Sequence, residues 1–299
     1  MKTIRWFPRK NNATPDDELA VCKRLPELTD EADKVQVSVT FTWDIEKAER
    51  MAKQWEVVAP VEIDGPAHGN AGGDFVPGRF IRHGYTITSR GCPSHCPGCK
   101  VPEREGALRL LPIRDGYNLF DNNILACPRE HVEAVFEMLE RQRQRPKFTG
   151  GLEAARLRPW HVDWLLRLKP DTMWMAYDRP AEWEPLREAV RMLSEAGIVS
   201  PHKSKRTGAY VLMGWRGDTP EAAEKRLRDV IYGLQIKTQA MWLDNGAESR
   251  SEDFSRWRDL RRHYTNAASV GAMVAEAWEL PNASGEQTIG ADSLKGKEL

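Results

Sequence analysis

The chain has 299 residues, of which 40% are hydrophobic, and its 44 basic and 44 acidic side chains leave no formal net charge. A chain of this length and composition can bury a sizeable core, as one large domain or as a large domain with a small one. No apolar run approaches the ~20 residues of a membrane span, and no basic excess marks the whole chain as a nucleic-acid binder, so we expect neither a membrane nor a nucleic-acid partner.

The first periodic elements predict a small β-α-β unit near the N-terminus. Residues 35–41 alternate between apolar and polar side chains, which indicates a strand, and residues 44–55 carry apolar side chains at helical spacing. Asp44 is a candidate cap of this helix, because its carboxylate could accept hydrogen bonds from the first turn. A second apolar run over 57–63 completes the unit. The Gly-, Pro- and Asn-rich stretch 64–78 is expected to be a loop or linker.

From residue 81 onward, strand and helix patterns alternate six times. Strands are expected at 85–89, 118–125, 147–152, 172–178, 209–215 and 238–243, and helices begin at Pro128, Pro159, near Trp183 and at Thr219-Pro220. This alternation predicts an α/β fold with the order of an open (β/α)6 barrel. We therefore expect an N-terminal unit with its linker over 1–80, a barrel over 81–245, and C-terminal helices with a flexible tail over 246–299.

Three of the five cysteines lie within eight residues, in the run CPSHCPGC that follows the first of these six strands. Cys92, Cys96 and Cys99 have the spacing C-x3-C-x2-C, so their thiolates can converge on one metal centre. Three thiolates leave a fourth position for a ligand other than protein cysteine, which favours an iron–sulfur cluster with one open iron. A structural zinc site closed by His95 or Cys127 stays open as an alternative.

These residues carry a resemblance to a known family. The stretch 84–106, GYTITSRGCPSHCPGCKVPEREG, resembles the first strand and cluster loop of radical S-adenosylmethionine (SAM) enzymes, and residues 81–245 resemble their partial TIM-like barrel. The resemblance implies that the three cysteines hold a [4Fe–4S] cluster whose fourth iron binds SAM, and that an external electron donor such as a flavodoxin or a ferredoxin supplies one electron. SAM would then be cleaved to a 5′-deoxyadenosyl radical. Gly98 stands where this family usually has an aromatic residue.

The N-terminal unit resembles a shortened form of the Rossmann-like domain that precedes the barrel in cobalamin-dependent radical SAM enzymes. The D-x-H-x-x-G signature of cobalamin binding is absent, because His68 follows Asp64 at the wrong distance. We therefore expect a structural unit, or a wall of the substrate site, that binds no cobalamin.

The carboxyl ends of the predicted strands are where further site residues should be sought, because ligands of parallel α/β folds gather there. The resemblance implies that Asp121, Asn122 and Asn123, in the second β/α unit, receive the methionine ammonium of SAM. It implies that Gly150 and Gly151 approach the cofactor closely and that Glu153 binds its ribose or ammonium. It also implies that Tyr177 and Asp178 contact ribose and that Met213 and Gly214 lie along adenine. The alternatives are ordinary turns for residues 121–123 and for residues 150–153, and a strand bulge for Gly214.

Only Cys22 and Cys127 remain beyond the triad, too few for the extra thiolates of an auxiliary cluster. The sequence therefore favours a single-cluster radical SAM enzyme that abstracts hydrogen from a substrate it does not identify. A radical methyl or alkyl transferase is the rival among enzymes. A non-catalytic zinc- or iron–sulfur-binding interaction protein is the rival from another class. The odd cysteine count and the lack of an apolar leader predict a cytoplasmic protein.

Overall fold

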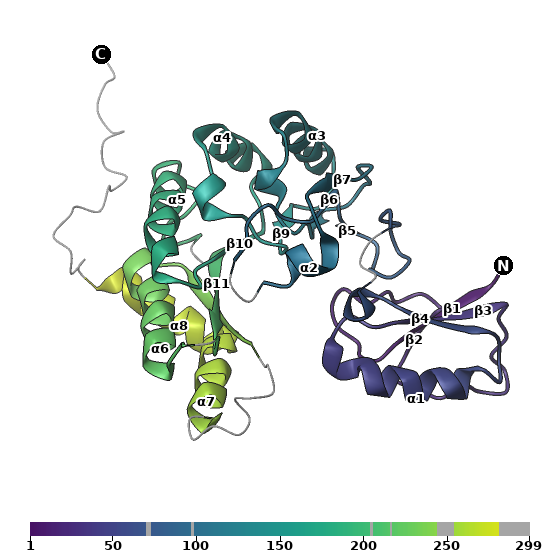
Figure 1. The fold of residues 1–299 in the computed structure, drawn as a ribbon. Coiled ribbons are helices and arrows are strands. Elements are labelled where there is room, and N and C mark those ends of the chain that lie inside the picture. The colour runs from purple at the N-terminus through teal and green to yellow at the C-terminus, as the bar shows by residue number, and fades with distance from the viewer. Residues whose placement is uncertain (70–72, 97–98, 204–205, 216, 244–253, 281–299) are drawn as a thin grey trace, which may run out of the picture. The chain divides into compact units, whose positions relative to one another are not determined.

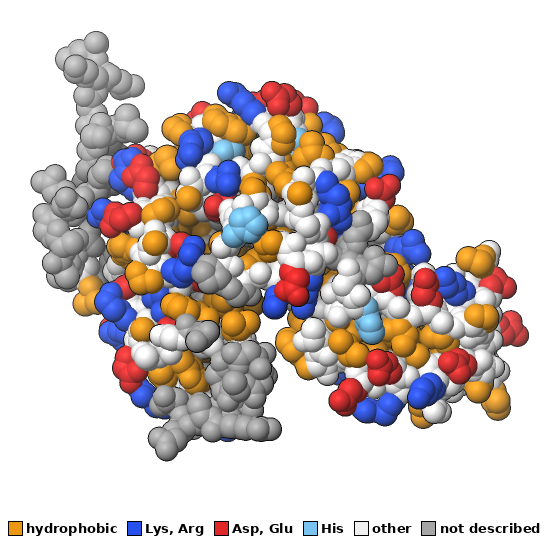
Figure 2. Space-filling view, viewed as in Figure 1, with side chains coloured by type: hydrophobic (Ala, Val, Ile, Leu, Met, Phe, Trp, Pro, Cys, Tyr) orange, Lys and Arg blue, Asp and Glu red, His pale blue; other side chains and the backbone are white. Residues whose placement is uncertain are grey.

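The computed structural model describes residues 1–69, 73–96, 99–203, 206–215, 217–243 and 254–280 (Figure 1). The chain divides into two compact units, residues 1–150 and 151–299. The predicted tail after residue 280 lies outside the described residues. Across the described part of the chain, no helix is long and apolar enough to cross a membrane. Charged side chains of both signs are interspersed over the visible face (Figure 2).

A four-stranded parallel sheet in the order β2-β1-β3-β4 forms the N-terminal part of the first unit. Its strands are β1 (Thr3–Phe7), β2 (Ala20–Cys22), β3 (Lys34–Ser38) and β4 (Val61–Asp64). The predicted β-α-β unit is β3, α1 and β4. Strand β1 was not predicted from the sequence, although Thr3, Ile4, Arg5 and Trp6 alternate between polar and apolar side chains; this alternation spans only four residues, and Arg5 is buried with the apolar ones.

Helix α1 (Ile45–Trp55) lies along one face of this sheet (Figure 1). Ala48, Ala52 and Trp55 are buried and pack in one apolar cluster with side chains of the strands. The predicted cap is wrong, because the Asp44 carboxylate makes no cap bond to the described residues of α1. It accepts hydrogen bonds from Arg9 Nε at 2.5 Å and Arg9 Nη2 at 2.7 Å, a two-pronged charged contact that outcompetes the backbone amides.

The rest of the first unit contains three parallel strands, with β8 (Asn118–Leu119) between β5 (Tyr85–Thr86) and β9 (Lys147–Phe148). An antiparallel pair, β6 (Ser89–Arg90) and β7 (Arg109–Leu110), brackets the cysteine run and α2 (Val101–Glu105). Helix α3 (Arg129–Glu140) follows Pro128 as predicted and buries one apolar face.

The second unit has β11 (Thr207–Met213) between β10 (Thr172–Ala176) and β12 (Lys237–Trp242), all parallel. Its helices are α4 (Pro159–Leu168), α5 (Trp183–Glu195), α6 (Pro220–Arg228), α7 (Phe254–Thr265) and α8 (Ala267–Glu279). Thr219 caps α6, because its Oγ1 accepts a hydrogen bond from Ala222 N at 3.2 Å.

Short helical turns complete both units: Thr42–Asp44, Pro66–His68, Ile124–Ala126, Ala154–Arg156, Pro180–Glu182 and the π-turn Asp229–Gly233. Each of the six ranges predicted after residue 81 contains or overlaps a strand, so the predicted α/β class is confirmed. The predicted ranges 118–125 and 147–152 are too long, because β8 and β9 have two residues each and Ile124–Ala126 is a helical turn. The open partial barrel and the domain boundaries near residues 80 and 245 stay predictions.

Candidate functional site

The segment that carries the three cysteines is closed at its base by β6 and β7. Arg90 Nη1 pairs with Glu105 Oε1 at 3.0 Å, and these side chains are only 16% and 9% exposed. Gly91 begins the segment at φ 81°, and a Cβ atom there would lie 2.3 Å from the carbonyl oxygen of Ala107, so the position requires glycine. The hairpin and the ion pair therefore fix both ends of the loop.

The cysteines of this loop form no disulfide with the described residues; Cys92 and Cys96 are half-buried and Cys99 is exposed. Cys99 N donates to Cys96 O at 3.1 Å, and residues 97–98, Gly98 included, lie outside the described residues. Within the described ranges, no three side chains of His, Cys, Asp or Glu are close enough together to hold a metal ion. The structure thus supplies three available thiols without bringing them into one metal site.

Two N–H groups point at the sulfur of Cys92, and this observation tests whether the loop fits an iron–sulfur cluster. Ser94 N lies 3.4 Å and Asn123 Nδ2 3.3 Å from Cys92 Sγ. Such N–H···S hydrogen bonds stabilise the negative charge of a cluster and set its reduction potential. Three closely spaced thiols, with N–H groups aimed at the sulfur of Cys92, are a donor set that fits an iron–sulfur ligand loop.

Asp121 anchors the chain that leads into this loop. Its Oδ1 accepts from Thr88 N at 2.7 Å, and its Oδ2 accepts from Thr88 Oγ1 at 2.7 Å and from Ser89 Oγ at 2.6 Å. Burial raises the pKa of the Asp121 carboxyl to about 6, although these hydrogen bonds act in the opposite direction. The side chain therefore holds residues 88–89 in place, and its predicted contact with SAM stays a prediction.

The two residues after Asp121 continue this contact along the loop. Asn122 Oδ1 accepts from Gly91 N at 3.0 Å, and Asn123 Nδ2 donates to Cys92 Sγ. Residues 121–123, which we call the clasp, therefore bind the run 88–92 at successive points. The sequence placed the clasp in the second β/α unit but gave no signal that it would contact the cysteine loop.

Close packing of the backbone explains why position 150 is a glycine. Its N–H donates to Leu119 O at 3.1 Å, and a Cβ atom there would lie 2.5 Å from the carbonyl oxygen of Asp121. In the second unit, Gly151 has φ 98°, and the carboxylate of Glu153 accepts from Arg156 Nε at 2.5 Å. Each residue thus has a structural role, and the predicted contacts with cofactor stay predictions.

Asp178 ties the end of β10 to β11. Its Oδ1 accepts from Leu212 N at 2.7 Å, and its backbone N–H donates to Glu182 Oε2 at 2.7 Å. Burial raises the pKa of the Asp178 carboxyl to about 6. The neighbouring Tyr177 is buried and packs against Trp183 with ring centroids 5.3 Å apart, so of the two residues Asp178 presents the more accessible polar group.

The end of β11 is held by a buried ion pair that sequence reasoning missed. Gly214, at φ 79°, donates its N–H to Asp218 Oδ2 at 3.0 Å. Asp218 in turn accepts from Arg226 Nη1 at 2.9 Å and Nη2 at 2.8 Å, and Arg226 Nη2 also donates to Leu212 O at 3.0 Å. The Arg226 and Asp218 side chains are 5% and 1% exposed. Eight positions separate them, so no helical i,i+4 spacing reveals the pair.

The predicted residues therefore fall into two groups, one in each unit. The clasp and the cysteine loop belong to the first unit, and Asp178 with Met213 and Gly214 belongs to the second. Met213 itself is fully buried.

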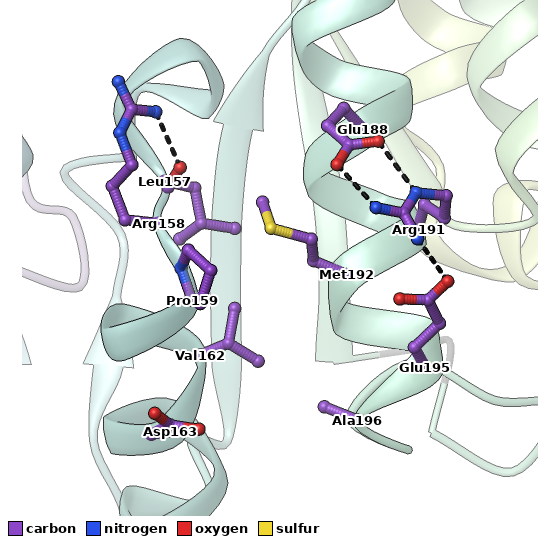
Figure 3. A pocket seen from close by; sticks show the side chains of 10 residues that line it. All are labelled: Leu157, Arg158, Pro159, Val162, Asp163, Glu188, Arg191, Met192, Glu195 and Ala196. Carbon is purple, nitrogen blue, oxygen red and sulfur yellow. Dashed lines mark hydrogen bonds and ion pairs between the residues drawn. The ribbon is translucent and has the colours of Figure 1, made fainter.

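A groove of about 560 Å³ between α4 and α5 is lined by none of these residues (Figure 3). Its Arg191 forms ion pairs with Glu188 and Glu195.

No family model and no curated protein matches the sequence. Solved structures do match, among them TsrM from Kitasatospora setae, a radical SAM methyltransferase, with cobalamin and a [4Fe-4S] cluster bound. That match has a TM-score of 0.57 at 12% identity and covers 80% of this chain and 74% of that chain. A second TsrM structure, with tryptophan substrate and a SAM analogue, matches with a TM-score of 0.53 at 13% identity over 71% of this chain and 62% of that chain. At such identities the similarity shows the fold alone.

Proposed function

We propose that this protein is a radical SAM enzyme that holds one [4Fe–4S] cluster through Cys92, Cys96 and Cys99. The observation that carries the proposal is the cysteine loop, in which three closely spaced thiols lie between the paired strands β6 and β7 and Asn123 donates to Cys92 Sγ. The fold similarity to TsrM supports it, because that enzyme is described with a [4Fe-4S] cluster.

The chain would bind and orient the cofactors. The clasp and the Arg90–Glu105 pair would hold the cluster loop, and the strand ends at Asp178 and Gly214 would bind SAM. The predicted cofactor contacts of Gly150, Gly151 and Glu153 belong to the same proposal. When bound, the cluster and SAM supply a 5′-deoxyadenosyl radical, which abstracts hydrogen from the substrate. An external donor such as a flavodoxin or a ferredoxin would deliver the electron.

Methyl transfer is a second candidate, because both matched structures are of a methyltransferase. TsrM is described with cobalamin, whereas this chain lacks the D-x-H-x-x-G signature. We therefore propose hydrogen abstraction first. The products separate the two reactions, since hydrogen abstraction releases 5′-deoxyadenosine and methyl transfer from SAM releases S-adenosylhomocysteine.

The test compares the wild type with Cys92→Ala and Cys127→Ala after anaerobic reconstitution with iron and sulfide. We expect about four irons per chain in the wild type and in Cys127→Ala, and a loss of bound iron in Cys92→Ala. With SAM and a reductant, the wild type should release 5′-deoxyadenosine. Stoichiometric zinc in anaerobically purified protein would overturn the cluster assignment. A bound cluster without SAM cleavage would instead support a non-catalytic interaction protein.

A further inference from the structure

The N-terminal sheet has a topological switch point at the carboxyl ends of β1 and β3. In the order β2-β1-β3-β4, the central strand β1 has β2 on one side and β3 on the other. The chain runs from β1 to β2 in one direction and from β3 to β4 in the other. Strands β2 and β3 both pair with β1 in parallel, so the connections after β1 and β3 lead away in opposite directions. Crevices at such points are where open parallel sheets bind ligands.

An aromatic platform is exposed at this point. The rings of Phe41 and Trp43, which follow β3, are stacked at 10° with centroids 4.7 Å apart. Arg9, which follows β1, has its guanidinium carbon 5.5 Å from the Phe41 centroid and 5.9 Å from the Trp43 centroid. Because these distances are nearly equal, the guanidinium lies beside the stacked pair and does not cover the outer face of Trp43. The Trp43 residue is 61% exposed, so a further ring can stack on that face.

Basic side chains gather around the platform. Lys47 Nζ donates to Pro8 O at 2.9 Å and Lys23 N donates to Phe7 O at 3.2 Å, which places both lysines at the carboxyl end of β1. Lys10 directly follows Arg9, and it is exposed, as is Lys23. Asp44 is buried and paired with Arg9, and the exposed Glu46 lies 3.7 Å from Arg50, so Lys10 and Lys23 contribute exposed positive charge at this edge.

We infer that this edge binds a planar aromatic ring that carries a phosphate group. The ring stacks on the outer face of Trp43, where any flat π-system gains contact, and the phosphate lies among Lys10 and Lys23. The basic groups select against SAM itself, which carries a sulfonium cation and no phosphate. The inference concerns residues away from the cysteine loop and does not rest on the proposed function.

The test titrates FMN and adenosine monophosphate with the full chain purified without a cluster, so the outcome is independent of iron or SAM binding. Quenching of flavin fluorescence reports stacking, and calorimetry gives the affinity of both probes. Trp43→Ala should weaken FMN binding about 5- to 100-fold, the range expected for one lost stacking contact, and Trp43→Phe should weaken it less. Because Trp43 is mostly exposed, both variants should retain the circular dichroism of the wild type.

Charge variants test the phosphate separately. Lys10→Gln and Lys23→Gln should weaken FMN binding several-fold and leave riboflavin, which lacks the phosphate, unaffected. Lys53→Gln is the matched control, because this exposed lysine lies in the last turn of α1 and should bind FMN like the wild type. Failure of both FMN and adenosine monophosphate to bind would overturn the inference. So would FMN affinity that is unchanged in Trp43→Ala, or equal affinities of the wild type for FMN and riboflavin.

Discussion

The hydrogen bond from Asn123 to the sulfur of Cys92 makes a specific prediction about the cluster. Asn123→Ala removes an N–H group that lies 3.3 Å from Cys92 Sγ. A hydrogen bond of this kind is worth about 1 kcal/mol. Because N–H donors stabilise the reduced, more negative cluster more than the oxidised one, its loss should lower the reduction potential by about 40 mV for one electron.

The assay is a redox titration of the reconstituted protein, followed by electron paramagnetic resonance without SAM. A chelator challenge gives a second measurement, in which Asn123→Ala should lose iron about 10-fold faster, as expected when a contact to a metal ligand is removed. Asn122→Ala is the matched control, because Asn122 accepts from Gly91 N and does not contact the sulfur. It should keep the wild-type potential.

An Asn123→Ala protein with the wild-type potential and iron retention would refute this reasoning. The same potential shift in both variants would also refute it, because the effect would then come from a loosened loop. Asn123→Gln offers a further comparison, since it keeps the amide but moves it by one methylene. A partial return toward the wild-type potential is expected only if the donor acts on the sulfur directly.

Three further changes should alter stability. Gly91→Ala should lower the free energy of unfolding by ~2 kcal/mol more than Gly106→Ala, because both have positive φ but only at Gly91 would the new Cβ atom clash, and urea unfolding measures the difference. Arg226→Met should cost about 3–5 kcal/mol by leaving a buried carboxylate without its partner, whereas Arg191→Met, at a 51% exposed side chain, should cost below ~1 kcal/mol; equal losses would contradict this. The raised pKa of Asp178 stabilises the fold below about pH 4, and this contribution is lost as pH rises through about 6. The wild type should therefore lose about 2 kcal/mol relative to Asp178→Asn between pH 4 and pH 7, and parallel pH profiles would exclude the effect.

Sequence periodicity was sufficient to predict most of the helices and strands. The six strands after residue 81 and the helices that follow them were predicted, because the strands are apolar runs bounded by turn residues and the helices expose one polar face. The same rule did not predict β1, where the alternation spans only Thr3 to Trp6, or β2, which has only three residues, because both patterns are short. The prediction for Asp44 was wrong because capping was judged from local sequence, whereas Arg9 lies 35 positions away.

For the candidate site, the sequence by itself determined the residue types: three closely spaced thiols, and polar residues where strands end. Only the tertiary structure decided which of them meet. In the parallel pairing of β5 with β8, Tyr85 lies opposite Asn118, 33 positions later in the chain. Thr88 and Asp121 are also 33 positions apart, and Thr88 N donates to Asp121 Oδ1. A parallel register is set by the packing of whole strands, which no local pattern in the chain encodes. That register is the reason why the clasp lies against the residues that lead into Cys92.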